Sequence, residues 1–157
     1  MKQGFVKVAS ATPRIRVADP VYNAQVICEQ AKEAAEHGAK IVVFPELCIT
    51  GYTCNDLFLQ ELLLEKAKEA LLTIAEETGQ LETLFLVGLP VDKDGRLYNV
   101  AAVLYRGRIL GMIPKKNIPM YAEFYEGRHF TPGEETVTEY RPVSYTHLRA
   151  HETSLHL

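Results

Sequence analysis

The 157-residue sequence has little of what stabilises secreted proteins or anchors membrane proteins. It contains three cysteines, an odd number that argues against a disulfide framework and favours reduced thiols in a cytoplasmic setting. Lys7 interrupts the apolar run near the N-terminus, so we expect no secretory signal peptide. No segment approaches the roughly 18 consecutive apolar residues that a membrane-spanning helix needs, so we expect no membrane partner.

A basic excess is also absent. The chain has 17 Lys and Arg against 20 Asp and Glu, for a net charge of −3, which argues against nucleic acid as a partner. Hydrophobic residues make up 47% and charged residues 24%, proportions typical of soluble globular domains. A chain of this length forms one domain with a sizeable core and needs no metal or disulfide to hold it together.

The alternation of strand and helix patterns predicts an α/β domain with a mixed sheet. Residues 5–11 and 41–44 are short apolar runs typical of buried strands, and Pro20 to Gly38 shows the apolar spacing of an amphipathic helix. After a loop from Glu46 to about Asp56, the same spacing predicts a second helix that ends before Gly79. Further strands are expected over 84–87, 99–104 and 109–113, with turns at 92–95 and 106–107.

Charged side chains follow two of the predicted strands. Glu46 comes after strand 41–44 and Pro45, at the carboxyl end where α/β folds bind ligands. Partial desolvation there suits a general base, and the alternative is an ordinary loop glutamate or helix cap. Lys115 and Lys116 follow the last strand, and each is a candidate cation for a developing oxyanion, the alternative being a solvated pair of charges. The aromatic-rich segment 114–132 is typical of a functional loop.

The cysteines and histidines give weaker signals. Cys28 lies on the apolar stripe of the first helix and is expected to be a packed thiol. Cys48 and Cys54 follow Glu46, and either is a candidate reactive thiol, but their spacing matches no common zinc site. His147 and His151 are four positions apart without the glutamate that a zinc-protease helix requires, so a polar tail is favoured. We therefore predict no metal site.

Three segments carry a resemblance to a known family: VADPVYNAQ (17–25), FPELCITGYTCNDLF (44–58) and PKKNIPMYAEFYEGRHF (114–130). They resemble the N-terminal glutaminase domain of the glutamine-dependent NAD synthetase family, within the nitrilase or carbon–nitrogen hydrolase superfamily. The resemblance covers about residues 3–142. It implies an α-β-β-α sandwich with mixed sheets, of which this chain supplies an incomplete part, so the isolated chain is expected to be poorly soluble or oligomeric.

The resemblance also implies roles for individual residues. Glu46 matches the family's general base, Lys115 matches the lysine that stabilises the tetrahedral oxyanion, and Glu126 resembles an additional glutamate near that lysine. The residues that match the substrate pocket are Tyr52, Tyr121 and Phe124. Because Lys116 stands where the family usually has a hydroxyl residue, which of the two lysines faces the site stays open.

The implied function is that of an amidotransferase. Glutamine is hydrolysed, and the ammonia passes to a separate synthetase domain that uses ATP and magnesium to amidate deamido-NAD. No cofactor is expected in this chain, and the full-length enzyme is expected to be a cytoplasmic homo-oligomer. The family's nucleophilic cysteine lies on a strand beyond the Tyr140 region, whereas this sequence has no cysteine after Cys54, so we expect the chain as written to be inactive. The alternatives are a stand-alone amidase of the superfamily and a non-catalytic glutamine-binding fragment.

The last residues depart from the family. We divide the chain into a partial carbon–nitrogen hydrolase domain over 1–142 and an unrelated tail over 143–157. The tail, VSYTHLRAHETSLHL, resembles the translated read-through of a sequencing adapter and is interpreted as an artefactual terminus.

Overall fold

A mixed five-stranded sheet forms the centre of the computed structural model, which describes residues 4–122, 124–134, 139–140 and 155–156. Its strands are, in spatial order, β1 (Val8–Ser10), β2 (Ile41–Val43), β3 (Leu84–Lys93), β4 (Arg96–Tyr105) and β5 (Arg108–Pro114). β2 pairs in parallel with both β1 and β3. β4 pairs antiparallel with both β3 and β5. This topology confirms the predicted α/β domain with a mixed sheet. β6 (Glu139–Tyr140) and β7 (Leu155–His156) pair separately.

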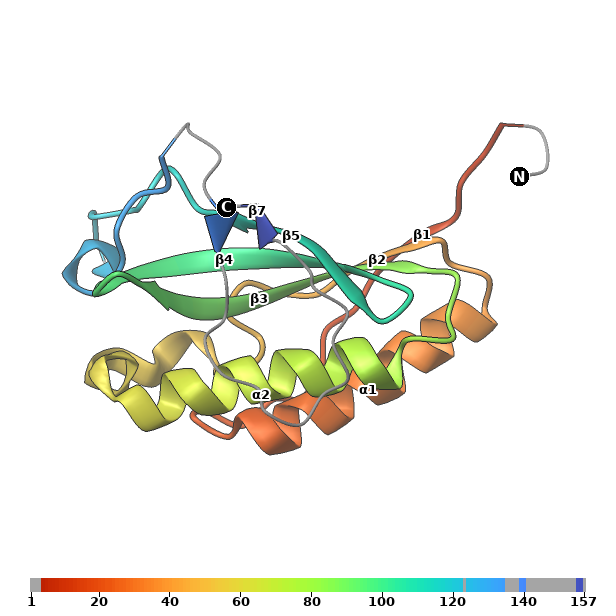
Figure 1. Cartoon of the computed structure of the whole chain (residues 1–157), viewed down its shortest axis with the longest axis horizontal. Helices are drawn as coiled ribbons and strands as arrows, with labels where there is room; N and C mark the ends of the chain where they lie inside the picture. The colour runs from red at the N-terminus through yellow and green to blue at the C-terminus, as the bar shows by residue number, and fades with distance from the viewer. Residues whose placement is uncertain (1–3, 123, 135–138, 141–154, 157) are drawn as a thin grey trace.

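Two long helices, α1 (Pro20–Glu36) and α2 (Glu61–Glu77), lie side by side on one face of the sheet (Figure 1). α1 starts at Pro20 because the preceding Asp19 caps it, its carboxylate accepting a hydrogen bond from the Tyr22 N–H at 3.1 Å. It ends before Gly38, whose φ of 81° suits glycine. Both predicted helices are therefore confirmed.

The observed elements differ from the predicted ones mainly at their ends. The first strand is shorter than 5–11, because only residues 8–10 pair with β2. The strand predicted over 84–87 continues to Lys93, since Pro90 keeps its place opposite Asn99 in the pairing with β4. The turn accordingly shrinks to Asp94 and Gly95, both with positive φ as in a two-residue hairpin. A kinked 3₁₀ segment, η1 (Tyr52–Leu59), replaces part of the expected loop and the expected start of the second helix.

The main core lies between the helices and the sheet. Side chains of the strands that face the helices are fully buried, including Val42, Phe85 and Leu104. They share one apolar cluster with Ile27 of α1 and Ile74 of α2. Burial of this apolar surface is the main force that holds the helix layer on the sheet.

The opposite face of the sheet has no helix over it within the described ranges (Figure 1). Its apolar side chains Val8, Val43 and Ile113 are exposed. The described residues thus supply one main sheet and one helix layer of the sandwich that the sequence resemblance implies. Neither helix of the described part is long and apolar enough to cross a membrane.

The predicted boundary at residue 142 and most of the predicted tail lie outside the described residues. His147 and His151 are among them, so the interpretation of this pair as part of a polar tail stays a prediction.

Candidate functional site

The segment that follows β2 crosses the sheet at Gly88 of β3. The Phe44 N–H donates to the Leu86 carbonyl at 2.9 Å, and the Ile49 N–H donates to the Gly88 carbonyl at 3.1 Å. A Cβ atom on Gly88 would overlap Leu47 N and lie 2.7 Å from the Pro45 carbonyl oxygen. The absence of a side chain at this position therefore lets the backbone around Glu46 pack directly on the sheet.

Three charged side chains meet where this segment reaches the end of β5. The Lys115 ammonium lies 2.7 Å from Oε1 of Glu46 and 3.0 and 2.9 Å from Oε1 and Oε2 of Glu126. Glu126 belongs to η2 (Glu126–Arg128), in the aromatic-rich loop. Glu46 and Lys115 thus converge at this end of the sheet, although 69 positions separate them. Of the two neighbouring lysines, Lys115 is the one that contacts Glu46 and Glu126, and Lys116 is exposed.

The three groups differ in exposure. The Glu126 side chain is 6% exposed, whereas those of Lys115 and Glu46 are 30% and 41% exposed. Burial lowers the pKa of Lys115, but the hydrogen bonds to Glu46 and Glu126 outweigh it, so the pKa lies above the ordinary lysine value. Lys115 is therefore a fixed cation between two carboxylates.

Asn99 completes the site and was missed by the sequence reasoning. Its side-chain amide donates a short hydrogen bond to Oε1 of Glu46, and its backbone carbonyl accepts one from the Lys115 N–H at 2.8 Å. The residue is buried on β4. The available signal was a lone amide beside the apolar run Val100 to Leu104, because a buried amide needs a partner.

The residues expected to line the substrate pocket take two positions. The Tyr52 hydroxyl donates to Oε1 of Glu126 at 2.9 Å, so this tyrosine lies at the site. Tyr121 and Phe124 pack edge to face against each other, with ring centroids 5.5 Å apart, and Tyr121 is largely exposed. Contact of these three residues with glutamine stays a prediction.

The three cysteines are free, buried thiols. Burial raises the pKa of Cys48 to about 11, and its Sγ–H donates to the Gly88 carbonyl at 3.7 Å. Burial likewise raises the pKa of Cys28 to about 11 and that of Cys54 above its usual value. Cys28 is packed as predicted. Burial and the raised pKa disfavour the thiolate forms of Cys48 and Cys54, which argues against a reactive thiol at either position.

An apolar hollow of about 350 Å³ adjoins Glu46, Asn99 and Lys115 on the helix-free face of the sheet. Its other walls include Val43, Leu86, Gly88, Ala101 and Ile113. A small apolar hollow that ends in a carboxylate and an ammonium suits a substrate with a carbonyl group, which the cation polarises while the carboxylate moves a proton. Among the described residues, no group of three His, Cys, Asp or Glu side chains is placed to hold a metal ion.

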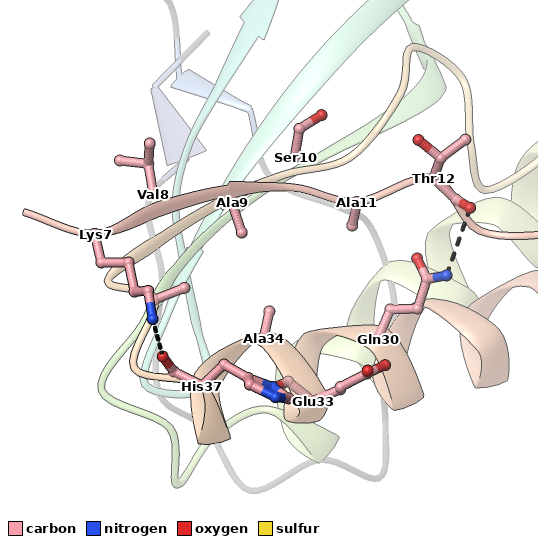
Figure 2. A pocket seen from close by; sticks show the side chains of 11 residues that line it. Lys7, Val8, Ala9, Ser10, Ala11, Thr12, Gln30, Glu33, Ala34 and His37 are labelled. Atoms are coloured by element: carbon pink, nitrogen blue, oxygen red, sulfur yellow. Dashed lines mark hydrogen bonds between the residues drawn. The ribbon is translucent and has the colours of Figure 1, made fainter.

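A second hollow, of about 320 Å³, lies between β1 and α1 (Figure 2). Two of its polar side chains bond backbone carbonyls: Lys7 donates to the His37 carbonyl at 2.7 Å, and the Gln30 amide donates to the Thr12 carbonyl at 3.5 Å. Within the described part of the chain, Lys7 forms no ion pair with a carboxylate, so the hollow beside Glu46 is the better candidate site.

Comparison with known proteins places this chain in a family. Residues 7–147 match the family model for carbon–nitrogen hydrolases. The glutamine-dependent NAD(+) synthetase of Mycobacterium tuberculosis is 40% identical over 133 residues, which are 85% of this chain and 20% of that protein. The glutamine-dependent NAD(+) synthetase of Thermotoga maritima is 36% identical over 135 residues, 86% of this chain and 23% of that protein. The chain thus spans about a fifth of the length of these relatives.

Solved structures show the same fold. The crystal structure of a glutamine-dependent NAD(+) synthetase from Cytophaga hutchinsonii matches with a TM-score of 0.83 and 26% identity, over 96% of this chain and 24% of that one. An amidase from Nesterenkonia sp. matches with a TM-score of 0.68 and 24% identity, over 87% of this chain and 51% of that one. At this identity the amidase likeness concerns the fold alone.

Proposed function

Since the chain belongs to the carbon–nitrogen hydrolase family, we propose that it forms the first part of a glutaminase domain that supplies ammonia for NAD synthesis. The observation that carries the proposal is the Glu46–Lys115–Glu126 cluster beside an apolar hollow. The identity of 36–40% with glutamine-dependent NAD(+) synthetases supports this substrate over that of a stand-alone amidase.

In the proposed reaction, the glutamine side-chain amide lies in the hollow with its carbonyl toward Lys115. Glu46 takes the proton of a cysteine thiol, and the thiolate attacks the amide carbon. Lys115 stabilises the negative oxygen of the tetrahedral intermediate, and Glu46 returns the proton to the departing nitrogen, which leaves as ammonia. Water then hydrolyses the thioester, with Glu46 as base, and releases glutamate.

The other side chains support these two groups. Glu126 holds Lys115 from the opposite side, and Tyr52 in turn holds Glu126. Tyr121 and Phe124 are proposed to close the pocket over the substrate. The nucleophile is a cysteine on a later strand, as the family resemblance implies, since the three thiols of this sequence are buried.

The proposal also covers the use of the ammonia and the behaviour of the isolated chain. The ammonia is used by a synthetase domain that takes ATP and magnesium, in a cytoplasmic homo-oligomer. This chain alone is proposed to release no ammonia from glutamine and to self-associate through the exposed apolar face of its sheet. Sedimentation of the purified chain tests the second point, and a monomer at micromolar concentration would contradict it.

A chimera tests the function directly. Residues 1–142 of this chain replace the matching segment of the Mycobacterium tuberculosis synthetase, and NAD formation is measured with glutamine or with free ammonium as nitrogen source. We expect both sources to work, and the chimera with Lys115→Met to retain only the ammonium-driven reaction. If ammonium works and glutamine fails in the unmodified chimera, this chain is not a glutaminase segment.

A second assay concerns the chain as it stands. Ammonia release from glutamine is measured for the purified protein and for Cys48→Ala. No release is expected from either, because the Cys48 thiol is buried. Release that Cys48→Ala abolishes would make Cys48 the nucleophile and refute this part of the proposal.

A further inference from the structure

Asn99 contacts both members of the Glu46–Lys115 pair. Its side chain donates to Glu46, and its backbone carbonyl accepts from the Lys115 N–H at 2.8 Å. The residue opposite it in β3 is Pro90, and the Asn99 carbonyl points to the other neighbouring strand, where it bonds the residue that follows β5. One buried strand residue thus contacts both the carboxylate of Glu46 and the backbone of Lys115.

The hydrogen bonds are unevenly divided between the two oxygens of Glu46. Oε1 accepts from the Asn99 amide and from the Lys115 ammonium. Oε2 accepts no hydrogen bond from the described residues. Two donors on one oxygen fix the rotation of the carboxylate and leave the other oxygen as its free acceptor.

We propose that Asn99 is a positioning residue whose amide, together with Lys115, holds Oε1 of Glu46 so that Oε2 is the oxygen that takes the proton. This assignment rests on the proposed role of Glu46 as general base. Asn99 suits the task because it is buried in the middle of a sheet, where its own rotation is restricted by packing. Lys115 alone would leave the carboxylate free to turn about a single bond partner.

The first test uses no change at Asn99 and so avoids a folding defect there. The side-chain amide signals of Asn99 are compared by NMR between the unmodified chain and Glu46→Gln. We expect the Asn99 signals to move upfield when the carboxylate is replaced by an amide, because a charged acceptor makes the stronger hydrogen bond. Asn23 is the matched control, since its buried amide donates to the backbone carbonyls of Arg16 at 2.7 Å and Ile49 at 2.9 Å. Unmoved Asn99 signals, or equal movement of Asn23, would overturn the assignment.

The second test measures what the position of Glu46 does to Lys115. The rate at which acetic anhydride modifies Lys115 at pH 8 reports the neutral fraction of its amine. If Asn99 positions Glu46, Asn99→Leu loosens the Glu46–Lys115 bond, and the rate rises about threefold because the amine loses part of the ion pair that keeps it protonated. Glu46→Gln sets the upper limit of the rise, and Lys32, paired with Glu77 on the helix side, keeps its rate.

An unchanged or slower modification of Lys115 in Asn99→Leu would show that Asn99 only fills space in the strand, and would overturn the proposal. Neither test uses glutamine. A failure of the positioning role is therefore distinguishable from a failure of the proposed glutaminase function, which the chimera reports separately.

Discussion

The two faces of the sheet are made by alternate residues of the same strands, but one face packs against the helices and the other is partly exposed to solvent. Val42 is fully buried under the helices, whereas its neighbour Val43 on the other face is 45% exposed. On β5, Met112 is buried and Ile113 is exposed in the same way. The period of two along a strand thus separates a face that holds the fold together from an apolar face that is open to solvent and adjoins the candidate site.

The helix-free face is itself divided. Part of it adjoins the loops after β2 and β5, whose side chains form a second small core together with one residue of α2 and one of β4. The members of this core are Leu47, Cys54, Phe58, Leu63, Leu97 and Phe130. These loops carry Glu46 and Glu126. The site is therefore positioned by a core of its own, and changes to that core should affect the site more than changes on the uncovered part of the face.

The largest effect on stability is expected from Gly88→Ala. The added Cβ would overlap the backbone of the loop after β2, where this loop crosses the sheet. A Cβ there lies 2.7 Å from the Pro45 carbonyl oxygen and 2.9 Å from the Glu46 carbonyl carbon, and backbone atoms cannot give way cheaply. We expect a loss of about 3 kcal/mol or more in the free energy of unfolding, measured in urea.

Gly95→Ala is the matched control for this substitution. Gly95 lies in the hairpin turn, where an added Cβ would meet no atom within 4 Å, and only its φ of 73° opposes alanine. Its cost should be about 1 kcal/mol, and equal costs for the two variants would show that overlap at Gly88 is unimportant.

The next effect compares the two faces directly. Val42→Ala opens a cavity in the main core and should lower the free energy of unfolding by about 2 kcal/mol. Val43→Ala removes the same atoms from a partly exposed position and should cost less than about 0.5 kcal/mol. Urea unfolding of both variants checks this, and similar costs would mean that Val43 is covered in solution.

Much of this two-faced sheet was predictable from local patterns. The spacing of apolar residues predicted both helices, and the apolar runs predicted where the strands lie along the chain. The length of β3 was not predictable, because Pro90 and the charged residues after it argue locally against a strand. Only pairing with β4 over residues 85–93 and 96–104 shows why the strand continues.

A smaller effect concerns the charged site at the edge of the open face. Lys115→Met should cost about 1 kcal/mol of unfolding free energy near pH 8, the upper end for a partly exposed ion pair. The pKa of Lys115 is raised in the folded state, so its contribution is fully present below the ordinary value near 10.4 and is lost as the pH rises through the higher folded value.

The measurement is the difference in unfolding free energy between the unmodified chain and Lys115→Met from pH 8 to 11. Lys116→Met, a change in the exposed neighbour, is the control and should show a smaller difference at pH 8. A Lys115 difference that grows above pH 10.4 would contradict the raised pKa.

The site was predictable only in part. Glu46 and Lys115 each follow a strand and a proline, so position alone made them candidates, and the family resemblance added Glu126. Asn99 could not be found in this way, because its role depends on a contact between β4 and a loop 53 positions away. The burial of Cys48 was equally hidden, since the turn after Glu46 directs its thiol into the main core.

The smallest effect is expected where the two site loops are joined at the surface. Arg128 lies 3.2 Å from Asp56, and both side chains are largely exposed, so Arg128→Ala should cost less than about 0.5 kcal/mol of unfolding free energy. His129 also contacts Asp56 at 3.2 Å but packs edge to face on Phe58, with ring centroids 5.9 Å apart. His129→Ala should therefore cost more, about 1 kcal/mol, because it removes packing on the small core.

Urea unfolding at low and high salt separates the effects of the two variants. Only the Arg128 effect should disappear at about 0.5 M salt, where exposed charges are screened. A larger loss for Arg128→Ala than for His129→Ala would mean that the ion pair and not the apolar cluster holds Glu126 beside Lys115.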